Sequence, residues 1–253
     1  MKFNNVSINS IYIGNTSINK VYKGSTLIVN NNQISFTPQA IMLTTGSSYT
    51  VPAGATSMKA WAIGSGGVGT QTGGAATLGG GSGGCAYKTW SVSGGDTISY
   101  SVGAAKLKTT IQGGANTTVT YSGTTITGNG GALPLNTVAG FSGGDGGANG
   151  GGPTSGWGDY GQSGGAVGGN GTRTACGRHP ATDVSGLFAA LALAGVSTSE
   201  TCATTAAFGS GGADQKYGPT KTAGIGGGGV LESGGLNISG TNSGIGAVVL
   251  YFT

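Results

Sequence analysis

The stretch from Gly128 to Gly171 reads GNGGALPLNTVAGFSGGDGGANGGGPTSGWGDYGQSGGAVGGNG, and 19 of its 44 residues are glycine. Two further glycine-rich runs, 64–84 and 209–229, flank it. Within the long stretch, glycines often recur at every third residue, as in the rows Gly144, Gly147, Gly150 and Gly165, Gly168, Gly171. A three-residue repeat is typical of the extended left-handed helix, which has no internal hydrogen bonds. We therefore expect a packed layer of extended, polyglycine II-like segments, because only glycine lets such backbones approach closely. Ordinary, well-tied loops are the alternative.

The amino-acid composition leaves little material for an apolar core. Of 253 residues, 57 are glycine, 36% are apolar and 7% are charged, where globular domains have about 25% charged residues. Collagen is excluded, because the Gly-X-Y period is not sustained and the chain has 6 prolines. Backbone hydrogen bonds must therefore carry an unusually large share of the stability.

The charges argue against a nucleic-acid partner. The net charge is +4, and the basic residues of the first 95 positions are five dispersed lysines, Lys2, Lys20, Lys23, Lys59 and Lys88. A nucleic-acid site needs clustered Lys and Arg with aromatic side chains between them. The start MKFNNVSINSI has no apolar segment of the kind found in signal peptides. The longest apolar run, 187–196, has about half the length of a membrane-spanning helix. We expect a soluble protein that is not exported by the standard route.

Residues 1–33 differ from the rest of the chain. INSIYIGNT at 8–16 is echoed by INKVYKGST at 18–26, a period of ten residues. Each unit resembles a strand followed by a glycine turn, which predicts a small β-meander with turns at Gly14-Asn15 and Gly24-Ser25. Because so short a meander buries little surface, we expect it to pack against a partner and to serve attachment or assembly.

Residues 34–253 are expected to form an all-β, glycine-rich domain. Alternating or β-branched runs predict strands, and we expect an antiparallel β-sandwich closed by the C-terminal strand. The runs are 40–44, 49–51, 56–63, 86–92, 97–102, 117–121, 124–127 and 247–252. Gly94-Gly95 is expected to join two of them as a hairpin. A helical insertion is expected within 173–208, with Asp183 or Thr182 capping a helix that runs through Ala194 and stops at Gly195.

The stretch YTVPAGATSMKAWAIGSGG, Tyr49 to Gly67, resembles the opening of the glycine-rich domain of tail-fibre and tail-tip proteins of tailed bacteriophages. The same family continues with glycine runs, a strand–Gly-Gly–strand unit ending in Val-Gly, here Trp90 to Gly103, and a closing strand, here Gly244 to Val249. The resemblance spans roughly residues 40–253, and the repeats at 8–30 also resemble those of phage tail proteins. The insertion 173–208 departs from the pattern.

The resemblance implies a virion protein of the phage tail, made in the host cytoplasm. Some fibre-tip adhesins of T-even-like phages hold host-recognition loops on glycine-rich segments. We therefore expect an adhesin that binds a bacterial outer-membrane protein or surface polysaccharide, and that meets other tail proteins through residues 1–33, with a homotrimer as one candidate assembly. An architectural virion protein, such as a capsid decoration or baseplate component, and an ice-binding or matrix protein remain as alternatives.

Receptor-binding candidates are side chains suited to stacking or hydrogen bonding in loops: Trp157, Asp159, Tyr160, Arg173, Arg178 and His179. Aromatic residues between glycines are poor core material and good platforms for sugars or proteins. An equal alternative is that Trp157 and Tyr160 cap the end of the glycine layer. Cys176 and Cys202 bracket the insertion and form a candidate disulfide, with two buried free thiols as the alternative. Cys85 is expected to be buried and unpaired.

Catalysis, cofactors and metals are not expected. No glycine run is followed by Lys-Ser/Thr at P-loop spacing. Asp145 and Asp159 could in principle form a hydrolytic pair, but solvated turn aspartates are the simpler reading. Cys176 and His179 lie three residues apart on a loop with no enforced geometry. Asp145 and Asn149 fall short of the six to eight oxygens that calcium takes.

Overall fold

The computed structural model describes residues 36–69, 80–133, 139–150, 183–196, 223–229 and 242–253, together with short strands within 2–30 and 71–77. The chain divides into two compact units, Met1–Thr37 and Pro38–Thr253. Among the described residues, no helix has the length and apolar character needed to cross a bilayer.

The N-terminal unit contains three antiparallel strand pairs. Its strands are β1 (Lys2–Phe3), β2 (Val6–Ser7), β3 (Tyr12–Ile13), β4 (Thr16–Ser17), β5 (Lys20–Lys23) and β6 (Thr26–Asn30). Ile13 pairs with Thr16 and Lys23 with Thr26, the pairs that flank the predicted turn positions. Among the described strands each pair is a separate two-stranded sheet, and the meander itself stays a prediction.

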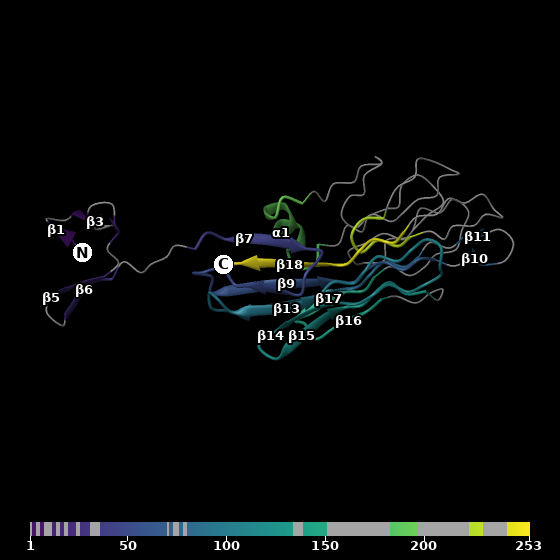
Figure 1. Cartoon of the computed structure of the whole chain (residues 1–253), viewed down its shortest axis with the longest axis horizontal. Coiled ribbons are helices and arrows are strands. Elements are labelled where there is room, and N and C mark those ends of the chain that lie inside the picture. Colours follow the sequence, from purple (N-terminus) through teal and green to yellow (C-terminus); the bar gives the residue numbers. More distant parts are fainter. Residues whose placement is uncertain are drawn as a thin grey trace. The chain divides into compact units, whose positions relative to one another are not determined.

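Within its described residues, the second unit is mostly β, with two five-stranded antiparallel sheets and one short helix (Figure 1). The first sheet has the order β17-β12-β9-β18-β7, comprising β7 (Gln39–Leu43), β9 (Ser57–Ile63), β12 (Cys85–Ser91), β17 (Gly146–Ala148) and β18 (Ala247–Phe252). The second has the order β16-β15-β14-β13-β8, comprising β8 (Ser48–Thr50), β13 (Thr97–Ser101), β14 (Thr117–Tyr121), β15 (Thr124–Gly128) and β16 (Phe141–Ser142). A further hairpin joins β10 (Gln71–Thr72) to β11 (Ala76–Thr77).

The C-terminal strand completes the first sheet. β18 inserts between β9 and β7, with Tyr251 opposite both Lys59 and Ala40. All but one of its residues are buried, as its unbroken apolar sequence predicts for an interior strand. β7, by contrast, is a partly exposed edge strand, and among the described strands it pairs with β18 alone.

The Gly94-Gly95 turn does not form the predicted hairpin. β12 and β13, on either side of it, belong to different sheets. The turn closes on itself through Asp96, whose N–H donates to the Ser93 carbonyl at 3.0 Å, and it is tied to the end of β8 by the bond from the Gly95 N–H to the Val51 carbonyl at 2.9 Å. These bonds direct the chain across the sandwich, so the turn is a corner between sheets.

The two sheets pack face to face around a core of small and medium side chains. β9 contacts β14 and β15, and β12 contacts β15. Fully buried side chains include Met58, Ala60, Ile98, Ile126 and Leu250. Tyr49 stacks on Phe252 with ring centroids 5.8 Å apart, which joins the sheets near one end.

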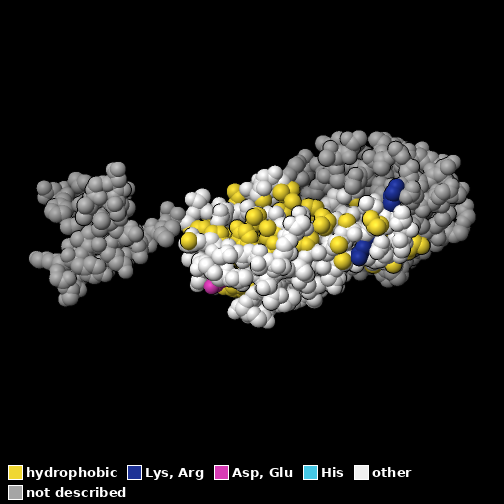
Figure 2. Space-filling model, in the orientation of Figure 1, with side chains coloured by type: hydrophobic (Ala, Val, Ile, Leu, Met, Phe, Trp, Pro, Cys, Tyr) yellow, Lys and Arg dark blue, Asp and Glu magenta, His cyan; other side chains and the backbone are white. Residues whose placement is uncertain are grey.

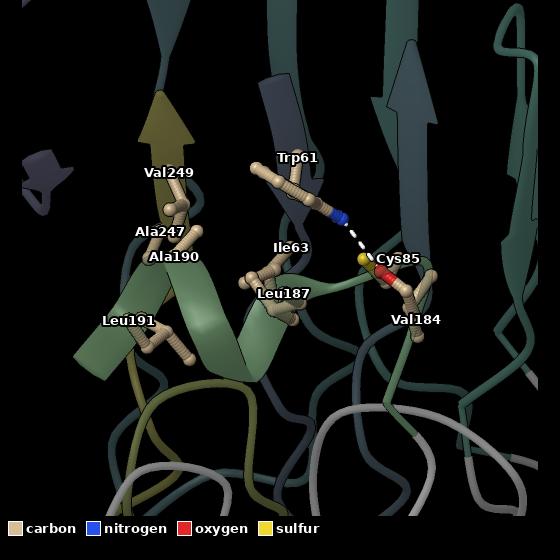
Figure 3. Close-up of a cluster of buried hydrophobic side chains, with 9 residues drawn as sticks. All are labelled: Trp61, Ile63, Cys85, Val184, Leu187, Ala190, Leu191, Ala247 and Val249. Atoms are coloured by element: carbon tan, nitrogen blue, oxygen red, sulfur yellow. Dashed lines mark hydrogen bonds between the residues drawn. The ribbon is translucent and has the colours of Figure 1, made fainter. Parts of the chain in front are cut away.

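Helix α1 (Leu187–Leu193) covers part of the outer face of the first sheet (Figure 3). Its Leu187, Ala190 and Leu191 pack against sheet residues that include Ile63 and Val249. Trp61 Nε1 donates a 2.7 Å hydrogen bond to the Val184 carbonyl, marked by the dashed line in Figure 3. The sheet and the segment entering the helix are thus joined by a directional bond as well as by apolar packing.

The predicted helix start is wrong, whereas its stop is confirmed. Ser185 and Gly186 have left-handed backbone conformations, with φ of 55° and 81°, so the helix begins only at Leu187. The Asp183 carboxylate still accepts a hydrogen bond from the Phe188 N–H at 3.1 Å, five residues later. Gly195, with φ of 74°, ends the helix as expected.

Candidate functional site

All the predicted receptor-binding residues lie outside the described residues. They are Trp157, Asp159, Tyr160, Arg173, Arg178 and His179, and the candidate disulfide residues Cys176 and Cys202 lie outside as well. These assignments remain predictions. The described part instead defines the backbone from which several loops extend, and a groove beside α1.

Residues 64–69 continue β9 beyond the sheet and are surrounded by other glycine-rich segments. Their successive N–H groups donate to carbonyl oxygens on three sides in turn. Residues three apart donate to one segment on two of these sides, and to two adjoining segments on the third. The pairs are Gly64 with Gly84 and Gly67 with Gly81; Ser65 with Ala115 and Val68 with Gln112; Gly66 with Gly244 and Gly69 with Gly229, at 2.9–3.4 Å. Gly244 and Gly229 belong to neighbouring segments, since the Gly244 N–H donates to the Gly227 carbonyl. The direction of the amides therefore repeats every three residues.

Several glycines in these segments leave no room for a side chain. A Cβ atom on Gly66 would overlap the Gly227 carbonyl, and one on Gly64 would overlap the Asn129 carbonyl. The predicted row Gly144, Gly147 and Gly150 likewise faces one neighbour, with Cβ positions against the carbonyls of Tyr87, Cys85 and Ser82. Gly147 itself lies in strand β17. Close backbone packing thus explains why glycine is required at these positions.

Buried hydroxyl side chains satisfy further amides among the glycines. Ser65 Oγ accepts from the Ala115 N–H at 2.8 Å, and Ser243 Oγ accepts from the Lys106 N–H at 2.8 Å. Thr117 Oγ1 accepts from the Gly103 N–H at 2.9 Å. All three side chains are buried. Hydroxyls here act as parts of the backbone network, which accounts for polar residues in a region with few apolar ones.

Several loops begin at one end of these segments. Gly69 and Gly80, which flank the β10–β11 hairpin, both donate to the carbonyl of Gly229, where the segment 230–241 begins. Asn242, where that segment ends, accepts through Oδ1 from the Lys108 N–H at 2.9 Å. Residues 69, 80 and 229 therefore lie together, as do residues 108 and 242, although they are far apart in sequence.

The turn around Leu107 exposes large apolar side chains. Leu107 is 62% exposed and Ile111 45% exposed, beside Lys106 and Lys108. Figure 2 shows dark blue basic side chains among scattered yellow hydrophobic ones on the face in view. Exposed apolar side chains beside lysines are typical of binding surfaces. This turn was not among the predicted sites, although a leucine between two lysines was a usable signal for an exposed apolar side chain.

A groove of about 450 Å³ lies between α1 and the outer face of the first sheet. Lys59, Trp61 and Tyr251 contribute from the sheet, and the helix side contributes Ser185, Gly186, Ala189, Ala190 and Leu193. Lys59 Nζ donates to both the carbonyl and the Oγ of Ser185 at 2.6 Å. The same ammonium lies 5.3 Å from the Trp61 ring and 5.0 Å from the Tyr87 ring. The groove is thus apolar with one fixed cation.

Asp145, considered above for calcium and for hydrolysis, is engaged by protein donors. Lys88 Nζ donates to Oδ1 and the Thr89 N–H donates to Oδ2, both at 2.8 Å. These bonds, first from Lys88 and then from Thr89, hold the pKa of Asp145 below its usual value. Within the described ranges, no group of three or more His, Cys, Asp or Glu side chains could hold a metal ion.

Cys85 is fully buried and unpaired, as expected. It packs with Trp61 and Val184 beneath the helix, and burial raises the pKa of its thiol well above the usual value. A protonated, inaccessible thiol is not a nucleophile. Cys85 therefore belongs to the apolar packing under α1.

Comparison with models of known protein families finds no match for this chain, and a search of curated proteins finds none either. The function is accordingly argued from the residues and their geometry.

Proposed function

We propose that this chain is a tail-fibre or tail-tip adhesin of a tailed bacteriophage, which recognises the host cell surface through loops carried on a rigid glycine-rich scaffold. The observation that carries the proposal is the three-residue rotation of hydrogen bonds around residues 64–69. In a three-fold extended helix, amides point outward in three directions and can bond to neighbours on every side. We infer that these segments form a polyglycine II-like layer.

Such a layer suits recognition because its stability comes from the backbone. Loops that begin and end at backbone hydrogen bonds can change sequence without changing the scaffold. The bonds of Gly69 and Gly80 to Gly229, and that of Lys108 to Asn242, join distant parts of the chain in this way at the end of the glycine-rich segments. The exposed Leu107 and Ile111 supply apolar contact area there. We place recognition at this end. Trp157 and Arg178 remain predicted receptor contacts from the sequence.

The proposal includes the partners that the resemblance implies. The receptor would be an outer-membrane protein or a surface polysaccharide, and residues 1–33 would join the chain to other tail proteins. The protein would act in the virion tail after synthesis in the host cytoplasm, without enzymatic activity.

Binding of the purified, fluorescently labelled full chain to panels of whole bacterial cells tests the proposal. We expect saturable binding to some strains and none to others, with unlabelled chain competing. Lys88→Gln, which changes a lysine of the sheet, is the matched control and should bind as the wild type does. If no strain binds the chain and purified tail or capsid proteins retain it instead, the adhesin proposal is wrong and the architectural alternative takes its place.

A further inference from the structure

We propose that the groove beside α1 binds a sugar residue bearing a carboxylate, such as a hexuronic acid unit, at a site separate from the loops at the end of the glycine-rich segments. The groove is built by Lys59, Trp61 and Tyr251 of the sheet against Ser185 and its neighbours on the helix side. The inference goes beyond the adhesin proposal and does not depend on it.

The cation is the first argument. Lys59 has no carboxylate within ion-pair distance among the described residues, where the one such pair is Lys88 with Asp145. Its ammonium has three N–H donors, and its hydrogen-bond partners among the described residues are the carbonyl and hydroxyl oxygens of Ser185, both neutral. Asp145 is near enough to interact electrostatically with Lys59 but forms its ion pair with Lys88. A ligand carboxylate would take the remaining N–H and pair directly with the Lys59 ammonium. An apolar setting strengthens such a bond, because water competes with it less.

The fixed position of Lys59 is the second argument. Trp61 and Tyr87 lie beneath its ammonium, and Ser185 holds it from the helix side. Ser185 has a left-handed backbone, with φ of 55°, an unfavourable conformation for a residue with a side chain. Such strain is often found at ligand sites. The lysine is thus ordered before a ligand arrives, and binding loses less side-chain entropy.

The shape and lining favour a sugar over a hydrocarbon chain. Leu193 at the rim is 52% exposed, so the groove is open to water on that side. A sugar ring can place its apolar C–H face against Tyr251, Ala189 and Ala190 while its outer hydroxyls stay in water. The Ser185 and Tyr251 hydroxyls offer partners for the ring oxygens nearest the wall. Lys59 and Tyr251 are opposite each other on β9 and β18. A ligand carboxylate on Lys59 would therefore place the sugar ring next to the Tyr251 side chain.

Titration of the full chain with glucuronate, glucose and hexanoate, followed by NMR, tests the proposal. We expect glucuronate to shift the resonances of Tyr251, Ala189 and Ala190, and to bind about tenfold or more tightly than glucose, the factor that one charge-assisted hydrogen bond provides. Lys59→Gln should bring the two sugars to within about twofold, the residual expected once the charge is lost. Lys88→Gln should leave the preference unchanged, because that ammonium is paired with Asp145.

Two measurements keep the test decisive. The Trp61 Nε1–H resonance reports whether Lys59→Gln keeps the helix docked, and Tyr251→Ala should weaken both sugars by a similar factor. Equal binding of glucose and glucuronate, no shift with either sugar, or tighter binding of hexanoate than of glucuronate would each overturn the proposal. If the chain binds cells but not glucuronate, the sugar-site proposal alone is wrong. If it binds glucuronate but no cells, the adhesin proposal alone is wrong.

Discussion

The backbone of Gly66 lies so close to the carbonyl oxygen of Gly227 that a Cβ atom added at Gly66 would overlap that oxygen. The two residues come from distant parts of the chain, and both lie in segments joined by backbone hydrogen bonds. A contact of this kind cannot be relieved by a side-chain rotation, since both partners are backbone. Substituting Gly66 therefore tests whether close packing of the glycine segments contributes to the stability of the folded chain.

Gly66→Ala is therefore expected to lower the free energy of unfolding by about 1–3 kcal/mol or more, the usual effect of overpacking. Gly140→Ala is the matched control, because the nearest atom to its Cβ position is Asn129 Nδ2 at 3.6 Å, an ordinary contact. Chemical denaturation of both variants measures the difference. Equal stability of the two variants would mean that the close packing around Gly66 does not contribute.

Trp61→Phe is expected to lower the free energy of unfolding by about 0.5–1.5 kcal/mol more than Trp90→Phe does, because it removes one hydrogen bond. Both tryptophans are buried, but Trp61 Nε1 donates to the Val184 carbonyl, whereas Trp90 Nε1 has no partner within the described part of the chain. Amide hydrogen exchange in α1 should accelerate in the Trp61 variant and stay unchanged in the Trp90 variant. Similar exchange in both would show that the indole bond does not hold the helix.

Tyr121→Phe is expected to raise the pKa of Asp96 toward its ordinary value. The Tyr121 hydroxyl donates to Asp96 Oδ2 at 2.5 Å, and this bond, followed by that from the Ser93 N–H, lowers the pKa of the carboxyl. Carboxyl NMR titration measures the change, and Asp145 is the internal control because its donors are Lys88 and Thr89. An unchanged pKa of Asp96 would show that Tyr121 is not its main partner.

The same two carboxyl groups set the direction of the acid dependence. Their pKa values are lower in the folded than in the unfolded chain. The stability they contribute is therefore present above the unfolded pKa of about 3.9 and is lost as the pH falls through the folded values. We expect urea denaturation to show decreasing stability below about pH 4, with a smaller decrease in Asp145→Asn than in the wild type.

Iodoacetamide should not label Cys85 in the folded chain, and should label it fully in denaturant. The thiol is buried and its pKa is raised by desolvation. Peptide mapping by mass spectrometry checks this, and the same map tests the candidate Cys176–Cys202 disulfide. Rapid labelling of Cys85 under native conditions would contradict its packing beneath α1, whereas free Cys176 and Cys202 would leave that packing intact.

Trp157→Ala and Arg178→Ala are each expected to weaken attachment to susceptible cells by about 1–4 kcal/mol, as loss of an aromatic or arginine anchor does. Leu107→Ala tests the described surface at the end of the glycine-rich segments, and its 62% exposure predicts unchanged stability. Circular dichroism in parallel checks the fold. Silent substitutions at all three positions, together with loss of binding when residues 8–30 are changed, would contradict the adhesin assignment.

Local sequence patterns determined the strands and the helix end. Strands Thr117–Tyr121 and Ala247–Phe252 match their predicted bounds, because β-branched and apolar runs favour extended backbone whatever they pair with. Gly195 stops the helix as predicted, since a left-handed position favours glycine. The glycine-rich composition likewise predicted close backbone contacts, which Gly144 and Gly147 make, although Gly147 lies in strand β17.

Tertiary structure alone decided which segments meet. Nothing near Gly94-Gly95 distinguishes a hairpin from a corner between sheets, because the choice depends on bonds to Val51, far back in the chain. The hydrogen bonds of residues 64–69 and the contact of Lys59 with Ser185 also depend on partners far away in the sequence. Glycine and lysine carry no local signal for a distant partner, so these contacts follow from the packing of the whole unit. A residue's backbone preference is local, whereas its partners are set by the chain as a whole.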